Sequence, residues 1–316
     1  MANKQIFLPV IGIACNSSCI MCSVNSKKRD PHKGTTKQIL KDLIRGKQEH
    51  YERIEFTGGE PTIRKDLPIL IKKAQELGYK DIGISTNGIL LSDKKLCENL
   101  VKAGLSTVTI SLHAHNEQLN RRITRTPGVF KKTIQGIKNL TAYKELNISV
   151  VTVILRLNYK YILKIGELLK LLKITSWDIT DLLPDGRAKI NYKNLCVKRI
   201  ELSKMLSFLP AIVNDFQSIV FFAFSPCVIP PELLYNKKIS VITDQQKVDV
   251  EKPIRYNQNN NITNQFDIHR QIKTSACYQC IFNTQCGGLW SDYFKFFGDK
   301  ELQKLITKYK YLIKNF

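Results

Sequence analysis

The chain of 316 residues is 43% apolar and 9% aromatic. It can therefore bury one large core or two, which excludes a disordered chain. Lys and Arg outnumber Asp and Glu by 49 to 27, giving a net charge of +22, but the excess is spread from Lys4 to Lys314. A nucleic-acid surface is a clustered patch, so charge alone does not identify one. No apolar run approaches the roughly 20 residues that cross a bilayer, so no membrane-spanning protein is expected.

The first apolar stretch, Ile6 to Ala14, ends directly before Cys15 and could be mistaken for a leader peptide. Gly12 stands where a lipoprotein cleavage site needs an aliphatic residue, so we interpret the stretch as a buried strand. Nine cysteines, seven of them in two groups, favour metal ligation over disulfides because no secretory signal is recognisable. We therefore expect a cytoplasmic protein without membrane partners.

Along the chain, apolar runs rich in β-branched residues alternate with helical patterns, which is typical of βα units around a parallel sheet. Six strands are predicted, at Ile6–Ile13, Arg53–Thr57, Asp81–Thr86, Thr107–Leu112, Ile148–Leu155 and Ile174–Ile179. Five helices are predicted between them, at Thr36–Gln48, Asp66–Leu77, Ser92–Ala103, Phe130–Lys144 and Tyr161–Leu172. Gly78 and Gly104 follow two of these helices, in the position where glycine commonly ends a helix.

The alternation stops after about residue 200. A helix predicted at Glu201–Asn214 is followed by the Pro230-Pro231 pair, and Thr243 to Gln265 is polar and Asn-rich, which indicates a long surface loop. The sequence therefore predicts an α/β core over residues 1–200 and a smaller Cys-rich region over residues 201–316.

The first cysteine group, Cys15, Cys19 and Cys22, forms a CxxxCxxC motif directly after the first predicted strand. Three thiolates in one short loop can hold three irons of a cubane cluster, leaving the fourth iron open to an amine and a carboxylate. Zinc is the alternative, but structural zinc takes four ligands, usually as two close pairs.

Three later segments each lie at the C-terminal end of a predicted strand: Thr57-Gly58-Gly59-Glu60-Pro61, Ser85-Thr86-Asn87-Gly88 and Ser111-Leu112-His113. With the cysteine loop, they resemble the radical S-adenosylmethionine (SAM) superfamily over roughly residues 5–190. The resemblance implies an incomplete, TIM-like barrel of six βα units, a partial (βα)6 barrel with its site at the C-terminal ends of the strands. It also implies a 4Fe-4S cluster on the three cysteines, with SAM bound to it.

The same resemblance implies roles for individual residues. Gly58, Gly59 and Glu60 match the motif that binds the methionyl amino group of SAM, and Ser85, Asn87 and Ser111 line the SAM site. Arg156 is a candidate for the SAM carboxylate, or else an ordinary surface arginine. His113 and His115 are candidate catalytic residues facing the substrate, although an isolated histidine is more often structural. Met21 stands where the family often has an aromatic residue near adenine, which leaves the adenine contact open.

The second cysteine group comprises Cys277, Cys280 and Cys286, with Cys227 upstream. Four thiolates can close an iron-sulfur cluster completely or bind zinc. After a radical SAM core, the arrangement resembles the C-terminal SPASM and twitch extensions, which carry auxiliary 4Fe-4S clusters. A full SPASM extension uses more cysteines for two clusters, so we expect one auxiliary cluster here.

The resemblance implies that the enzyme cleaves SAM reductively to a 5'-deoxyadenosyl radical, with an electron donor such as flavodoxin or ferredoxin. Families with such extensions often modify ribosomally made peptides, so the predicted substrate is a peptide or protein side chain, with a small molecule also open. Two alternatives remain. The charge favours an RNA-modifying radical SAM enzyme, but no appended RNA-binding module is recognisable, so nucleic acid is not the expected partner. The other is a zinc-stabilised, non-enzymatic binding protein.

Overall fold

The computed structural model describes residues 6–26, 34–242 and 271–310. The predicted surface loop at Thr243–Gln265 lies outside these residues. The chain divides into two compact units near residue 150: the first holds residues up to Leu112 together with Asn116–Val150, and the second holds His113–His115 and most of the chain from Val151 onward. The predicted boundary at residue 200 stays a prediction.

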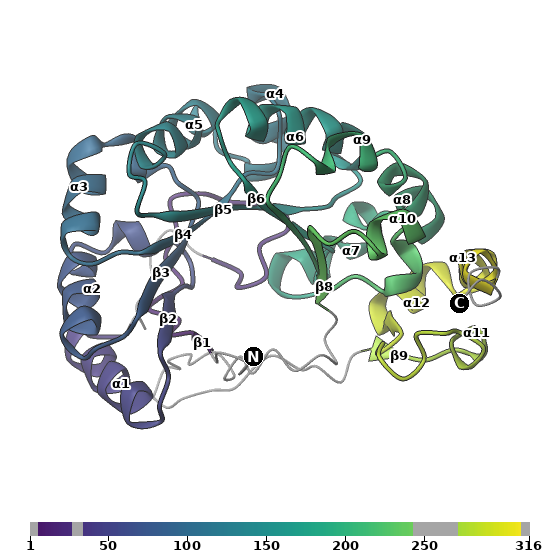
Figure 1. Ribbon diagram of the computed structural model, residues 1–316, viewed down its shortest axis with the longest axis horizontal. Helices are drawn as coiled ribbons and strands as arrows, with labels where there is room; N and C mark the ends of the chain where they lie inside the picture. The colour runs from purple at the N-terminus through teal and green to yellow at the C-terminus, as the bar shows by residue number, and fades with distance from the viewer. Residues whose placement is uncertain (1–5, 27–33, 243–270, 311–316) are drawn as a thin grey trace. The chain divides into compact units, whose positions relative to one another are not determined.

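The first unit is built on parallel strands that follow one another in chain order. The strands are β1 (Ile6–Phe7), β2 (Arg53–Phe56), β3 (Asp81–Thr86) and β4 (Thr107–Ser111). The helices are α1 (Thr36–Gln48), α2 (Leu67–Glu76), α3 (Lys94–Lys102), α4 (Glu117–Thr124) and α5 (Val129–Leu140), with the 3-10 turns η1 (Pro61–Ile63) and η2 (Leu90–Ser92). Figure 1 shows α1, α2 and α3 along one face of β2, β3 and β4.

Local sequence explains where these helices begin and end. Thr35 and Gln38 form a capping box at the start of α1, each side chain bonding to the other's backbone N–H. Asn116 caps α4 by accepting a hydrogen bond from the backbone of Leu119 at 2.9 Å. Gly78 and Gly104 follow α2 and α3 with φ of 81° and 107°, the left-handed conformation that glycine adopts most easily. Both predicted helix ends are therefore confirmed.

The second unit continues the βα pattern. Strand β5 (Asn147–Val153) leads into it, and β6 (Ser176–Thr180), β7 (Ser218–Phe222) and β8 (Ile239–Ile242) pair in parallel. Its first helical segments are η3 (Tyr159–Tyr161), α6 (Ile162–Leu171), α7 (Gly186–Leu195), α8 (Arg199–Leu206) and α9 (Pro210–Val213). The remaining segments are η4 (Pro226–Val228), α10 (Pro231–Leu234), β9 (Gln271–Ile272), α11 (Ser275–Tyr278), β10 (Leu289–Trp290), α12 (Ser291–Phe297) and α13 (Lys300–Lys310).

The predicted α/β fold class, with successive parallel βα units, is confirmed, and the sheet order is β1 to β8. The predicted count of six strands is too low because β7 and β8 extend the sheet. Strand β1 is shorter than predicted, although Val10 still pairs with Thr57 as an isolated bridge. The single helix predicted at 201–214 is two helices, since Pro210 starts a new one. None of the helices in the described ranges is long and apolar enough to cross a membrane.

Candidate functional site

The cysteine loop, residues 15–22, follows a stretch of chain that runs beside the end of β2. Backbone hydrogen bonds join the two: Gly59 N donates to Gly12 O and Glu60 N donates to Ala14 O, both at 2.8 Å. These bonds fix the chain up to the residue before Cys15, so the start of the cysteine loop is held against the sheet.

Gly58 and Gly59 make this contact possible. A Cβ atom on Gly58 would lie 2.1 Å from the carbonyl oxygen of Gly12, and one on Gly59 would lie 2.1 Å from that of Ala14. No side chain fits at these distances, and Gly58 also has a φ of 133°. The glycine pair thus permits a close approach of one backbone segment to another at the end of β2.

The carboxylate of Glu60 is buried and ties the end of β2 to the end of β3. Its Oε1 accepts hydrogen bonds from Thr62 N (3.1 Å), the Thr62 hydroxyl (2.5 Å) and the Thr86 hydroxyl (2.6 Å), and its Oε2 accepts one from Asn87 N (2.7 Å). Burial raises the pKa of Glu60, and the four donors oppose that rise. The donors are arranged to stabilise a charged carboxylate out of water.

The sulfur atoms of the cysteine loop receive hydrogen bonds from the protein. Ser17 N donates to Cys15 Sγ at 3.4 Å, and the Asn87 side-chain amide donates to the same sulfur at 3.7 Å. Ser26 N donates to Cys22 Sγ at 3.3 Å. Burial is the main cause that raises the pKa of Cys15, to about 11. Hydrogen bonds to cysteine sulfur stabilise the thiolate and tune the reduction potential of an attached cluster.

The C-terminal end of α4 holds the other side of the cysteine loop. Ser18 N donates to Thr124 O at 3.1 Å, and Ile20 N donates to Ile123 O at 3.0 Å. These two donors flank Cys19 in the sequence, so the end of α4 fixes the backbone on both sides of this cysteine. Sequence reasoning missed this contact because about 105 residues separate the partners and neither carries a recognisable motif.

The remaining predicted residues of the first unit lie on its strand ends. Asn87 contacts the cysteine loop a second time, since its side-chain amide donates to Asn16 Oδ1 at 2.7 Å. The Ser85 hydroxyl donates to Glu55, and Ser111 is half-buried at the end of β4. The structure therefore brings together the cysteine loop, Gly58–Glu60 and Asn87.

Three predicted residues belong to the second unit and are described by their own surroundings. His113 is buried, its Nδ1 accepts a hydrogen bond from Val153 N at 3.1 Å, and burial lowers its pKa to about 4. His115 packs against the ring of Tyr161 at 5.0 Å. Arg156 donates from its Nε to Cys196 O at 3.4 Å. His113 is thus a neutral, packed side chain at physiological pH.

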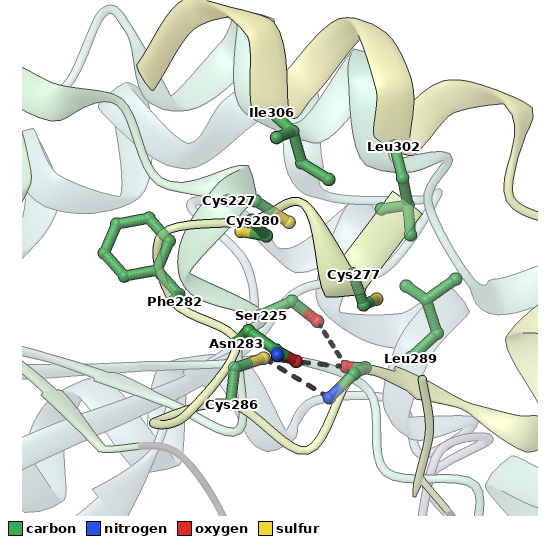
Figure 2. A pocket seen from close by; sticks show the side chains of 11 residues that line it. Ser225, Cys227, Cys277, Cys280, Phe282, Asn283, Cys286, Leu289, Leu302 and Ile306 are labelled. Atoms are coloured by element: carbon green, nitrogen blue, oxygen red, sulfur yellow. Dashed lines mark hydrogen bonds between the residues drawn. The ribbon is translucent and has the colours of Figure 1, made fainter. Parts of the chain in front are cut away.

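The second cysteine group lines one pocket, which Figure 2 shows and which we call the C-terminal pocket. Its cysteines come from four segments: η4, α11, the turn after α11 and the chain before β10. Leu302 and Ile306 of α13 form an apolar wall. The predicted set, Cys227, Cys277, Cys280 and Cys286, is therefore brought together although Cys227 lies about 50 residues upstream. Its lining residues include no Asp, Glu, Lys, Arg or His.

Local contacts hold the C-terminal pocket in shape. Gly288 N donates to Cys286 Sγ at 3.3 Å, and the buried Ser225 hydroxyl donates to Gly288 O at 2.9 Å. Burial raises the pKa of Cys227 far above that of a free thiol, and the three other cysteines of the pocket raise it further. An iron-sulfur cluster or a metal ion bound among these sulfurs would supply positive charge that stabilises the thiolate form of Cys227.

Beside this pocket the structure reveals a buried ion pair that the sequence did not signal. Arg199 of α8 is only 1% exposed, its Nη1 lies 2.7 Å from Asp181 Oδ2, and its guanidinium stacks 4.5 Å from the centre of the Tyr293 ring. Tyr293 donates in turn to Glu301 at 3.0 Å, which ties α12 to α13. The ion pair and its neighbours thus fix the helix that forms the apolar wall.

In the parts of the chain with described coordinates, no group of three or more His, Cys, Asp or Glu side chains converges on a position for a single metal ion. Tetrahedral zinc with bonds of about 2.3 Å draws its thiolates close together, whereas a cubane cluster occupies more space and needs them further apart. Cysteine thiolates ligate both iron-sulfur clusters and zinc, so the donor atoms themselves do not separate the two.

A family model described as the radical SAM superfamily matches residues 10–169. The chain therefore belongs to the radical SAM superfamily, and it is a radical SAM enzyme. Membership implies a 4Fe-4S cluster and SAM as cofactors.

The following relatives and solved structures share at most about a third of their aligned residues with this chain. Curated relatives named probable GTP 3',8-cyclase, from Saccharolobus islandicus and Sulfolobus acidocaldarius, are 31% identical over 179 and 176 residues. The match covers 57% of this chain and 57% of the S. islandicus protein, so the chain spans little more than half the length of these relatives. Among solved structures, anSMEcpe with bound AdoMet matches with a TM-score of 0.66 at 16% identity, covering 98% of this chain and 97% of that one. Streptococcus suis SuiB matches with a TM-score of 0.62 at 16% identity, covering 95% and 75%. These structural likenesses support the fold.

Proposed function

We propose that Cys15, Cys19 and Cys22 hold the cluster of this radical SAM enzyme. The observation that carries the proposal is the cysteine loop itself, whose backbone is held by the end of β2 on one side and by the C-terminal end of α4 on the other. When bound, the cluster and SAM together supply a 5'-deoxyadenosyl radical that removes a hydrogen atom from the substrate. The protein's own task is to hold the three sulfurs and to supply them with hydrogen bonds.

For SAM, the proposed contacts are Gly58, Gly59, Glu60, Ser85, Asn87, Ser111 and Arg156. Glu60 supports this assignment best. Its Oε2 accepts one hydrogen bond, from Asn87 N, and so keeps capacity for an ammonium donor. The four donors to this carboxylate favour its ionised form against the effect of burial, and a charged acceptor strengthens the contact with the methionyl ammonium.

The C-terminal pocket, in this proposal, holds one auxiliary 4Fe-4S cluster through Cys227, Cys277, Cys280 and Cys286. Four thiolates satisfy four irons, so no iron remains open for a substrate to bind. Leu302 and Ile306 wall the pocket on one side, and a cluster with no open iron favours electron transfer over substrate binding.

We infer that the substrate is a peptide or protein side chain. An auxiliary cluster with no open iron suits the uptake of an electron from a substrate radical, and the fold resembles SuiB, a protein whose structure has been solved with a precursor peptide bound. His113 is less suited to catalysis than His115, because its buried imidazole already accepts a hydrogen bond from Val153.

A nucleotide is the second candidate substrate, because the curated relatives at 31% identity are named probable GTP 3',8-cyclase. The names of these relatives and the likeness of the fold to SuiB point to different substrates, which an experiment can separate.

The experiment supplies anaerobically reconstituted enzyme with SAM and dithionite, and then with either GTP or candidate peptides. Dithionite alone should give slow formation of 5'-deoxyadenosine, and a true substrate should accelerate it and appear in modified form by mass spectrometry. Acceleration by GTP, with conversion of the nucleotide, would replace the peptide proposal. Absence of 5'-deoxyadenosine under every condition would contradict the cluster assignment.

A further inference from the structure

Three arginines lie together at the C-terminal end of α4, next to the cysteine loop. Arg121, Arg122 and Arg125 are all exposed. The chain has 12 arginines against 37 lysines, so three arginines within five positions stand out from the evenly spread lysine excess. We name this group the arginine cluster and propose that it is the docking surface for a small acidic protein that carries single electrons. The inference rests on the proposed function, in which the cysteine loop holds the cluster.

Arg125 lies between two residues that contact the cysteine loop. It ends α4 in a left-handed conformation with φ of 52°, between Thr124 and Thr126. Thr124 O accepts the hydrogen bond from Ser18 N, and the Thr126 hydroxyl accepts a second one from the same group at 3.3 Å. The residues on both sides of Arg125 therefore contact the residue directly before Cys19.

The cysteine loop reaches the surface at this point. Ser18 is exposed and Cys19 is half-buried, whereas Ser17 and Ile20 on either side are buried. An electron that enters the cluster from outside crosses the least protein where a ligating cysteine lies close to solvent. A carrier docked on the arginine cluster would therefore stand at the loop's exposed edge.

The charges of the arginine cluster are available to a partner. Within the described residues none of the three guanidinium groups forms an ion pair, and the acidic residue of α4, Glu117, is engaged with the backbone N–H of Gly128 at 2.9 Å. Arginines pair with carboxylates in a two-pronged geometry and are less strongly hydrated than lysines, which suits them to protein interfaces. Their field also steers an acidic partner toward the site before contact.

The chemistry requires such a partner, since each SAM cleavage consumes one electron that the chain does not contain. The reduced carrier donates one electron and dissociates in its one-electron-oxidised form. That electron goes to the sulfonium of SAM by way of the cluster, the C5'–S bond breaks, and methionine and a 5'-deoxyadenosyl radical result. An RNA would also be attracted by three arginines, but it would not supply the electron.

The test reverses the charge of the arginine cluster and compares two reductants. The variant Arg121→Glu/Arg122→Glu/Arg125→Glu is assayed for 5'-deoxyadenosine with a reduced acidic flavodoxin and, separately, with dithionite, which needs no docking. We expect the flavodoxin-driven rate to fall about tenfold or more at low salt and the dithionite-driven rate to stay unchanged. Added salt should lower the wild-type rate with flavodoxin and leave the variant's rate nearly constant.

The matched control is Lys72→Glu/Lys94→Glu/Lys95→Glu, which makes the same charge change at exposed positions of α2 and α3. It should keep the flavodoxin-driven rate within about twofold of wild type, because these positions lie outside the α4–α5 turn. Equal loss in the control would assign the effect to total charge and overturn the docking site. The milder variant Arg121→Gln/Arg122→Gln/Arg125→Gln should give an intermediate loss, and it serves if charge reversal impairs folding.

Two further outcomes would overturn the proposal. An unchanged flavodoxin-driven rate, together with weaker binding of a single-stranded RNA probe, would assign the arginine cluster to nucleic acid. Failure of wild type to cleave SAM with dithionite would remove the proposed function and this inference with it, whereas loss with flavodoxin alone leaves the proposed function standing.

Discussion

The two cysteine groups are held in opposite ways. The cysteine loop is one short segment, and backbone hydrogen bonds to the end of β2 and to the C-terminal end of α4 fix it. The C-terminal pocket gathers its cysteines from segments spread over about 60 residues and is walled by apolar side chains of α13. The loop therefore depends on contacts within the first unit, whereas the pocket depends on the packing of the segments from η4 to α13.

The largest expected effect comes from removing a sulfur of the cysteine loop. Each of Cys15→Ala, Cys19→Ala and Cys22→Ala should reduce dithionite-driven formation of 5'-deoxyadenosine to background, because no other group replaces the lost iron ligand. The control is Cys97→Ala, since the thiol of Cys97 donates to Leu91 O inside the first unit. A normal amount of 5'-deoxyadenosine from any of the three variants would contradict the assignment of the cluster to the cysteine loop.

Removing sulfurs of the C-terminal pocket should separate two activities. Cys280→Ala and Cys286→Ala are expected to keep uncoupled SAM cleavage and to lose modification of the substrate, since the cysteine loop is intact in both. Circular dichroism and the remaining iron-sulfur absorbance would exclude a general loss of folding, and Cys196→Ala provides a buried control in the same unit. Variants that fold and retain both activities would show that the pocket is incidental.

A methyl group on Gly59 tests how strictly the loop is positioned. Gly59→Ala places a Cβ 2.1 Å from the Ala14 carbonyl oxygen, so the chain before Cys15 must move. Displacements near 1 Å commonly cost about 100-fold in rate, and we expect a loss of that order in SAM cleavage. Gly128→Ala is the control, because Gly128 has a positive φ but no atom within 4 Å of the added Cβ. Equal losses in the two variants would mean that crowding at Gly59 is unimportant.

The smallest expected effect is on stability, at His113. It tests whether this histidine is a packed, neutral side chain in the folded protein. Its folded pKa of about 4 lies below that of a free imidazole, so the contribution to stability is complete above about pH 6.5 and is lost as the pH falls toward 4. Between pH 7.5 and pH 5 the free energy of unfolding should fall by about 2 kcal/mol from this group. His113→Asn keeps an acceptor for Val153 N and should remove this part of the pH dependence in denaturant titrations. An unchanged pH dependence in that variant would mean that His113 is protonated in the folded chain.

Much of the first unit was predictable because its signals are local. The β-branched runs, the glycines after α2 and α3, and the spacing of the cysteine loop each lie within one segment, and the structure confirms the elements they predict. The grouping of Cys227 with the later cysteines was also predicted, from the need for a fourth ligand.

Other features could not be predicted because they depend on partners distant in sequence. Two adjacent glycines, Gly58 and Gly59, indicate a close approach of another group to the backbone. Only the fold shows that this group is the backbone of Gly12 and Ala14. Strands β7 and β8 were missed since the prolines around them suggested the end of the βα pattern. The role of Thr124 depends on a backbone contact, which carries no residue signature.

The most direct test of the account is the metal and sulfide content of the anaerobically reconstituted wild-type chain. Two clusters predict about eight iron and eight sulfide per chain, falling to about four of each in Cys280→Ala/Cys286→Ala. Two zinc ions without sulfide, or an iron content that the double variant does not change, would contradict it.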